Sequence, residues 1–137
     1  MSYLFDTNVV SELRKGRRAN KGASVWARTI PEDQIFLSVI TLHEIERGIL
    51  GAERRGRPEA SILRTWFDGE LRPSYVSRTL PVTLEISLKA APFAVARTVE
   101  LADHLIAATA LVHGLTLVTH NTRHFTHTGV PLFDPFS

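Results

Sequence analysis

Three acidic residues and one asparagine stand close behind short apolar stretches of this sequence. Asp6 directly follows the apolar residues 3–5, and Asn121 follows the apolar run that ends at residue 118. Glu44 and Asp103 each lie in the first turn of a predicted helix. If these side chains converge, their carboxylates raise one another's pKa and destabilise the fold, unless a cation neutralises them. Oxygen ligands suit Mg²⁺ or Mn²⁺, and a Mg²⁺ ion held by carboxylates supports the hydrolysis of phosphate esters.

Each of these residues also has a purely structural interpretation. Asp6 can cap the helix that follows it, and Thr41-x-x-Glu44 fits a capping box in which Glu44 bonds back to the Thr41 backbone. Asp103 would favour the positive end of its helix, and asparagines such as Asn121 are common in turns. Taken singly, the four residues therefore leave both interpretations open.

Strand-like and helix-like segments alternate along the chain. Short apolar runs rich in β-branched and aromatic residues predict strands over 3–5, 35–40, 79–82, 116–119 and, at an edge, 130–133. The spacing of apolar residues predicts helices over 9–14, 24–29, 41 onward, 58–67, 83–91 and 100–113. This alternation predicts one α/β domain over residues 1–137 with a mostly parallel sheet. Ligands of such sheets bind at the carboxyl ends of the strands, which is where the polar residues stand.

Glycine and proline mark the expected helix ends. The helix at 58–67 is expected to stop before Gly69 and Pro73, and Pro92 is expected to interrupt the helix at 83–91. Gly114 is well placed to end the helix at 100–113. The apolar face of that last helix is predicted from four residues at helical spacing: Leu101, Leu105, Ala108 and Val112.

Length and composition exclude several classes of protein. The chain has 137 residues, of which 44% are hydrophobic and 22% charged, the balance of an ordinary globular domain. It has no cysteine, which excludes a disulfide scaffold, a thiolate metal site and a cysteine nucleophile. No window approaches the ~20 apolar residues of a membrane span, and the first residues lack the basic region of a signal peptide. We therefore expect a cytoplasmic protein without membrane association.

The identity of the cations is more informative than the net charge of +2. Sixteen cations accompany fourteen acidic residues, and thirteen of the sixteen are arginine. Arginine is the better residue for bidentate phosphate contacts, and the cations cluster in residues 14–18 and 54–57. Because such clusters also occur on ordinary solvated faces, the composition permits nucleic-acid binding without establishing it.

Four segments, in order, resemble the motif blocks of PIN-domain proteins. They cover residues 6–13, 40–48, 102–110 and 118–125, with the sequences DTNVVSEL, ITLHEIERG, ADHLIAATA and VTHNTRHF. The sequence is most similar to the VapC toxins of bacterial toxin–antitoxin pairs, and to their FitB-like branch in particular. The resemblance extends into the tail at 130–136 and so covers nearly the whole chain.

The resemblance implies a PIN fold, an α/β/α sandwich around a mostly parallel sheet. It also implies a Mg²⁺-dependent endoribonuclease, in which Mn²⁺ can substitute, that hydrolyses RNA phosphodiesters with a metal-activated water. The substrate would be transfer RNA or another structured RNA, and cleavage would leave 5′-phosphate and 3′-hydroxyl ends. The implied partners are a VapB-type antitoxin and a second copy of the chain in a homodimer.

Matched position by position, the resemblance assigns roles to the polar residues at the strand ends. Asp6 and Asp103 would be the primary Mg²⁺ ligands. Glu44 would complete the acidic centre, either directly or through a water. Asn121 would be the fourth member of the catalytic set and would position water or substrate.

Two further groups of residues are expected around the acidic centre. Thr7 and Thr119 would flank it and hydrogen-bond to the groups that form it. Four arginines are candidates for holding the RNA backbone, and equally for meeting acidic groups of an antitoxin: Arg14, Arg17, Arg18 and Arg47.

The chain departs from the family pattern in three places. His120 stands where relatives often have Arg, which puts one phosphate contact in doubt, although a protonated histidine could partly supply it. Asp134 stands where relatives often have Asn. Residues 92–97 lack the glycine-containing loop common in relatives, so the resemblance does not carry over their substrate specificity.

The histidines beside the acidic residues are not expected in the site. His43 and His104 adjoin Glu44 and Asp103, but neighbouring positions on a helix do not face the same way. Three further histidines are expected at the surface or in turns: His113, His124 and His127.

Two other functions compete with RNA hydrolysis. In a non-catalytic module the acids would be structural, and the arginines would bind RNA or a partner without cleavage, so that Asp6→Asn would leave function intact. A Mg²⁺-dependent phosphatase or receiver domain normally carries a lysine near a later strand end, but no lysine follows Lys89. The sequence therefore favours the nuclease.

Overall fold

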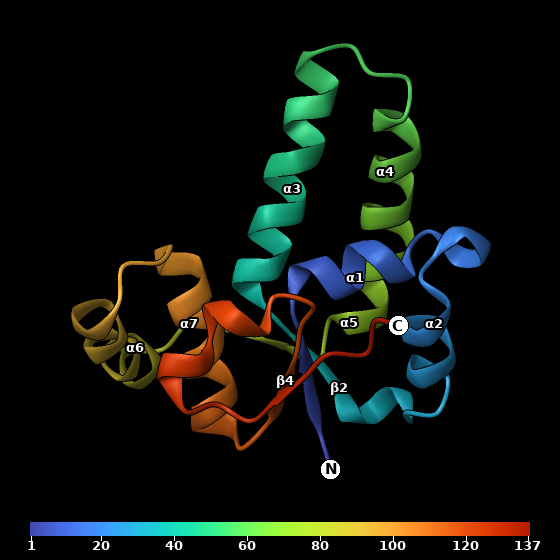
Figure 1. The fold of residues 1–137 in the computed structure, drawn as a ribbon. Coiled ribbons are helices and arrows are strands. Elements are labelled where there is room, and N and C mark those ends of the chain that lie inside the picture. The colour runs from blue at the N-terminus through green and yellow to red at the C-terminus, as the bar shows by residue number, and fades with distance from the viewer.

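The structure is a computed structural model that describes all residues, 1–137. Five strands form a parallel sheet in the order β3-β2-β1-β4-β5, with β1 at its centre (Figure 1). The strands are β1 (Tyr3–Phe5), β2 (Ile35–Ser38), β3 (Thr79–Leu80), β4 (Thr116–Val118) and β5 (Leu132–Phe133). The predicted α/β fold with a parallel sheet is therefore confirmed.

Helices follow most of the strands and cover both faces of the sheet (Figure 1). They are α1 (Thr7–Leu13), α2 (Lys21–Ala27), α3 (Val39–Arg54), α4 (Ala60–Trp66), α5 (Arg72–Tyr75), α6 (Leu84–Ala96) and α7 (Leu101–His113). Short helical turns lie at η1 (Gly16–Arg18), η2 (Glu32–Gln34), η3 (Phe67–Leu71), η4 (Thr122–His124) and η5 (Thr126–Thr128). No helix of this chain combines the length and the hydropathy that crossing a membrane requires.

Each face of the sheet has its own hydrophobic core. Successive strand residues point to opposite faces, so Leu4 and Leu117 join one core, whereas Phe5 and Val118 join the other. The first core contains the apolar sides of α6 and α7, and the second contains those of α1 and α3. Both faces of the sheet are therefore buried, as in most parallel sheets.

Helix α3 begins two residues earlier than the sequence predicts. Ser38 is its N-cap, because the Ser38 hydroxyl accepts a 3.0 Å hydrogen bond from the backbone N–H of Ile40. The strand predicted over 35–40 is correspondingly two residues too long. The capping box at Thr41 and Glu44 is wrong, since Thr41 lies inside α3 and is completely buried.

Helix α4 ends at Trp66, before Gly69 and Pro73 as predicted, but helical structure continues beyond it, and the helix end expected at Pro92 is wrong. Gly69 lies inside η3, a wider helical turn that joins α4 to α5 and buries Phe67 and Leu71. Pro73 occupies one of the first two positions of α5, where the missing N–H costs little. Pro92 lies within α6, which continues to Ala96 because Phe93, one residue beyond the proline, packs in the core.

Helix α7 ends as predicted but is buried more widely than predicted. Gly114 follows it with a φ of 66°, a left-handed conformation that glycine adopts without strain. Leu101, expected on the apolar face, is 68% exposed, whereas Ile106 and Ala107 are completely buried. The helix lies against both α6 and the sheet, so most of its middle is covered.

Helices α3 and α4 project from the body as an antiparallel arm (Figure 1). Arg64 on α4 binds Glu46 on α3 through two hydrogen bonds of 2.8 and 2.7 Å, and it also contacts Glu53 at 3.1 Å. The hydrogen bonds from Arg64 hold the pKa of Glu46 below its usual range. Because the two glutamates are two turns apart, they mark the side of α3 that faces α4.

Candidate active site

Asp6 lies at the carboxyl end of the central strand and is buried, with 5% of its surface exposed. Its carboxylate accepts three hydrogen bonds: from the Thr7 backbone N–H at 2.8 Å, from Thr119 Oγ1 at 2.7 Å and from Asn8 Nδ2 at 3.2 Å. The first of these bonds makes Asp6 the N-cap of α1. The capping interpretation is therefore correct, but it accounts for one hydrogen bond of a carboxylate that has three.

The electrostatics around Asp6 oppose a bare negative charge. The pKa of Asp6 is raised from 3.8 to about 6, mainly by burial, and the hydrogen bonds from Thr119 and Thr7 only partly offset that effect. The charges of Asp103 and Glu44 make a smaller contribution to the same rise. The chain thus gathers three acidic groups at one edge of the sheet, and the charges of two of them disfavour ionisation of the third.

Glu44 is oriented by residues from two elements. Thr7 Oγ1, at the start of α1, donates a 2.6 Å hydrogen bond to Glu44 Oε1 on α3, and it lies 3.2 Å from Thr41 Oγ1. This contact connects residues 37 positions apart in the sequence. It places the Thr7 hydroxyl on Glu44, and it leaves Glu44 Oε2 without a hydrogen bond from the chain.

Asp103 stands in the first turn of α7 and is partly exposed. Its Oδ2 lies 3.3 Å from Nδ1 of His124, in the turn after β4. Burial raises the pKa of Asp103, the positive charge of His124 opposes that rise, and the charge of Glu44 adds to it. His124 was expected to be a surface residue, and it is half exposed, but its contact with Asp103 was not predicted.

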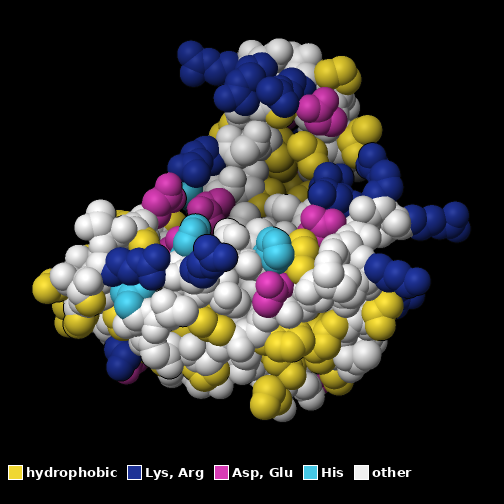
Figure 2. All heavy atoms as spheres, in the orientation of Figure 1, with side chains coloured by type: hydrophobic (Ala, Val, Ile, Leu, Met, Phe, Trp, Pro, Cys, Tyr) yellow, Lys and Arg dark blue, Asp and Glu magenta, His cyan; other side chains and the backbone are white.

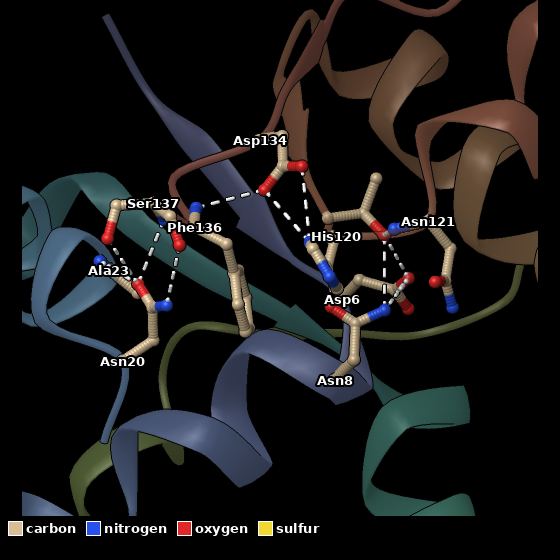
Figure 3. Close-up of polar contacts among 10 residues, drawn as sticks. Asp6, Asn8, Asn20, Ala23, His120, Asn121, Asp134, Phe136 and Ser137 are labelled. Atoms are coloured by element: carbon tan, nitrogen blue, oxygen red, sulfur yellow. Dashed lines mark hydrogen bonds and ion pairs between the residues drawn. The ribbon is translucent and has the colours of Figure 1, made fainter. Parts of the chain in front are cut away.

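Thr119 and Asn121 bring the end of β4 to Asp6. The Thr119 hydroxyl donates to Asp6 and accepts a 3.1 Å hydrogen bond from the backbone N–H of Asn121. Asn121 is therefore held by its backbone beside the acidic centre, with its side chain exposed (Figure 3). Thr119 thus lies between Asp6 and Asn121, which is the place the sequence predicts for it.

Asn8 is a site residue that the sequence analysis missed. Its Nδ2 donates to Asp6 at 3.2 Å and lies 3.2 Å from Thr119 Oγ1, while its Oδ1 accepts a 3.0 Å hydrogen bond from the backbone N–H of His120 (Figure 3). One amide thus links the ends of β1 and β4. Its place two residues after Asp6 was a usable signal, because an amide side chain in the first turn of a helix can reach back to the cap.

The oxygen atoms at this edge are of the kind that magnesium binds, although the side chains do not lie close enough together to surround an ion. No group of three or more His, Asp or Glu residues is arranged closely enough to hold a bare ion. Mg²⁺ commonly keeps several waters and takes only one or two carboxylates directly, which matches an open edge lined by oxygen donors. Burial is the main cause of the raised pKa values of Asp6 and Asp103, the charges of neighbouring acids add to it, and a bound cation would favour the ionised carboxylates.

The two histidines expected to point away from the site do so. His43 is exposed on α3. His104 is buried with its Nε2 2.9 Å from Nε2 of His127, and burial lowers the pKa of His104. His127 was expected at the surface or in a turn; it lies in the turn η5 but points inward, because it packs against His104 and Phe93.

Two of the three departures from the family pattern, His120 and Asp134, contact each other. Nδ1 of His120 lies 3.2 Å from Oδ2 of Asp134, and the His120 ring stacks on Phe136 with 4.1 Å between ring centroids (Figure 3). Asp134 also accepts a 2.9 Å hydrogen bond from the Phe136 backbone N–H. These contacts hold the segment after β5 against His120, the residue that follows Thr119.

The candidate RNA-binding arginines do not form one group. Arg14 lies at the far end of α1 from Asp6, about 12 Å along the helix axis, with its guanidinium 5.9 Å from the centre of the Trp66 ring. Arg17 and Arg18 follow it in η1 and are exposed. Arg47 stands one turn beyond Glu44 on α3, exposed and without an ion pair, and is the member that adjoins the acidic centre.

The sequence matches the family described as PIN domain over residues 3–130. This chain belongs to the PIN-domain family. This PIN-domain protein is 31% identical to VapC ribonuclease Y4jK of Sinorhizobium fredii, over 97% of its own length and 96% of that protein's. It is 27% identical to toxin FitB of Neisseria gonorrhoeae, over 97% of each chain. The resemblance to VapC and FitB toxins that the motif blocks indicate is confirmed.

Solved structures agree with the fold of this PIN-domain protein. It is similar to a chain of the FitAB complex bound to an IR36 DNA fragment, with a TM-score of 0.86 and 26% identity over 98% of this chain and 96% of that one. It is also similar to a chain of FitAcB from Neisseria gonorrhoeae, with a TM-score of 0.83 and 27% identity over 97% of each. The α/β sandwich with a central parallel sheet is the fold that these chains share.

Proposed function

We propose that this PIN-domain protein is the toxin of a toxin–antitoxin pair, and that it hydrolyses RNA phosphodiester bonds at the carboxyl edge of its sheet with the help of Mg²⁺. The observation that carries the proposal is Asp6: a buried carboxylate fixed by three donors, with a raised pKa, near two further acids. A full-length relative named as a VapC ribonuclease supports the same assignment.

Each residue of the site has its own role in the proposed reaction. Asp6 and Asp103 are the groups that would hold the ion, with Mn²⁺ as a possible substitute. Mg²⁺ would lower the pKa of a water and neutralise charge on the scissile phosphate. Glu44, whose Oε1 is occupied by Thr7, keeps Oε2 free to orient the attacking water and accept its proton. Asn121, exposed beside Asp6, is placed to position water or a substrate oxygen.

The proposed partners follow from the same family. FitAB and FitAcB are complexes, and we infer a VapB-type antitoxin for this chain. We further infer a homodimer, for which large exposed apolar side chains on α6 and the start of α7 are candidates: Leu84, Leu88, Val95 and Leu101. The substrate is an RNA, with transfer RNA or another structured RNA as the first class to examine, and the place of action is the cytoplasm.

Growth of a bacterial host tests the biological role. Induced expression of the wild type is expected to arrest growth, and co-expression of its cognate VapB-type antitoxin is expected to relieve the arrest. A folded Asp103→Asn variant should be harmless at the same protein level. If that variant arrests growth as the wild type does, the toxin acts without the acidic centre, and the non-catalytic binding module is the better account.

A further inference from the structure

The tip of the α3–α4 arm carries arginines that the acidic centre does not explain. Arg54, Arg55 and Arg57 are exposed, and Arg54 and Arg55 have no ion pair within the chain. Arg57 has only a loose contact of 3.8 Å to Glu59. Glu53, the acidic residue directly before Arg54, is already paired with Arg64. The tip therefore presents uncompensated positive charge, and dark blue side chains gather there in Figure 2.

These cations lie on the same side of α3 as the acidic centre. Glu46 and Glu53 face α4 through Arg64, so residues about a quarter-turn to a half-turn away from them face away from α4. That sector holds, in order from the base of the arm to its tip, four charged residues and a glycine: Glu44, Arg47, Gly51, Arg54 and Arg55. In Figure 1, α4 lies on one side of α3, and α6 and α7 lie on the other side, near its base.

The surface between the acidic centre and the tip is free of obstruction. A side chain added at Gly48 would meet no atom within 4 Å, and one added at Gly51 would meet only the end of the Arg55 side chain at 3.6 Å. Arg47, between Glu44 and Gly48, is exposed. From Glu44 to Arg54 the helix rises about 15 Å, which corresponds to about four stacked nucleotides at roughly 3.4 Å each.

Helix-end electrostatics account for only part of this arrangement. A cation in the last turn of α3 is favoured by the helix dipole, which explains Arg54. It also favours Arg55, the C-cap residue, but it does not explain Arg47, which lies in the middle of the helix, or Arg57, which lies beyond the cap. An acidic segment of a protein partner would meet the tip well, but it would also be repelled by Glu44 at the base of the same face. The phosphates of an RNA strand would instead meet the cation that the acidic centre is proposed to bind.

We propose that this face of α3 is a track for RNA, on which Arg47, Arg54 and Arg55 contact the phosphates of the strand that enters or leaves the acidic centre. The proposal rests on the proposed ribonuclease function and adds to it a second binding region, about four nucleotides from the cleavage point. Substrates that extend along the arm are then bound more tightly than substrates that cover the acidic centre alone.

Binding of fluorescein-labelled oligouridylates tests the track. Affinity is measured by anisotropy at several KCl concentrations, with Ca²⁺ in place of Mg²⁺, for oligomers of about four and about sixteen nucleotides. The Arg54→Gln/Arg55→Gln double variant should bind the long oligomer about tenfold more weakly and reduce its salt slope by about 1.4. Its affinity for the short oligomer should be unchanged, and Arg54→Lys/Arg55→Lys should retain most of the long-oligomer affinity.

The control variant and the alternative outcomes make the test decisive. Lys89→Gln removes an exposed cation from α6, away from the arm, and should bind both oligomers as the wild type does. Equal binding of the long oligomer by the wild type and the glutamine double variant would overturn the proposal. So would a double variant that binds RNA normally but no longer forms a complex with the antitoxin, which would make the tip a protein-contact surface. Cleavage is assayed separately, so that a failure of the ribonuclease proposal can be distinguished from a failure of the proposal that RNA binds along α3.

Discussion

Thr119 Oγ1, at the end of β4, donates a 2.7 Å hydrogen bond to Oδ2 of Asp6, at the end of β1. Both residues are buried, and they follow directly on two neighbouring parallel strands. The bond stabilises the charged form of Asp6, against the effect of burial. The sheet thus provides both the burial that raises the pKa of Asp6 and the Thr119 hydroxyl that limits the rise.

Removing that donor should shift the ionisation of the site. A hydrogen bond to a charged group contributes about 1.5–3 kcal/mol, and about 1.4 kcal/mol corresponds to one pKa unit. Thr119→Val should therefore raise the pKa of Asp6 further above its value of about 6 and reduce RNA cleavage at pH 7 about tenfold, with recovery at higher pH. Thr119→Ser keeps the donor and should follow the wild-type pH profile. Identical profiles for all three proteins would contradict the role given to this bond.

Asp6 should destabilise the metal-free protein at neutral pH. Its pKa is about 6 in the folded chain and 3.8 as an ordinary carboxyl, so the folded state binds more protons between these values. The free energy of unfolding then falls as pH rises from about 4 to about 6, and stays low above that range. In EDTA at pH 8, Asp6→Asn should be more stable than the wild type by up to about 2–3 kcal/mol, and the difference should vanish below pH 4. Urea denaturation at both pH values measures it; a variant that is less stable at pH 8 would refute the sign.

The Thr7–Glu44 contact should matter for turnover more than for substrate binding. Thr7→Val leaves the Glu44 carboxylate without the 2.6 Å donor that orients it, so kcat should fall about tenfold with little change in KM. Thr7→Ser should restore most of the loss. If Thr7→Val changes KM alone, Glu44 acts in substrate binding and not on the attacking water.

The His120–Asp134 pair should make a small, salt-sensitive contribution to stability. The His120 side chain is 53% exposed, and exposed ion pairs typically contribute below about 1 kcal/mol. In a double-mutant cycle with His120→Ala and Asp134→Ala, we expect a coupling energy of about 0.5 kcal/mol that declines at high salt. A coupling of zero at low salt would mean that stacking on Phe136 alone holds this ring.

Local sequence signals predicted the elements that lead into the site. The apolar run before Asp6 predicts the end of β1, and the glycine after residue 113 predicts the end of α7. Both signals depend on neighbouring residues alone, and both predicted ends are correct. The start of α3 was misplaced because Ser38 and Thr41 are both acceptable caps by type. Burial of Thr41 and its approach to Thr7, 34 residues earlier, decided between them.

The contacts that complete the site depend on tertiary structure and were out of reach. His124 meets Asp103 only because α7 and the turn after β4 end at the same edge of the sheet. The contact between His120 and Asp134 likewise requires β5 to pair beside β4. Pro92 failed as a helix terminator for a related reason: packing of Phe93 in the core outweighs the local cost of proline.

The most direct test of the acidic centre is cleavage of a total transfer-RNA pool by the purified, partner-free protein, followed in Mg²⁺, in Mn²⁺ and in EDTA. Asp6→Asn and Asp103→Asn are compared after circular dichroism has shown that they are folded. We predict discrete fragments with 5′-phosphate ends that require the metal and that are absent with both variants. Equal cleavage by the wild type and the folded variants, or undiminished cleavage in EDTA, would contradict the account.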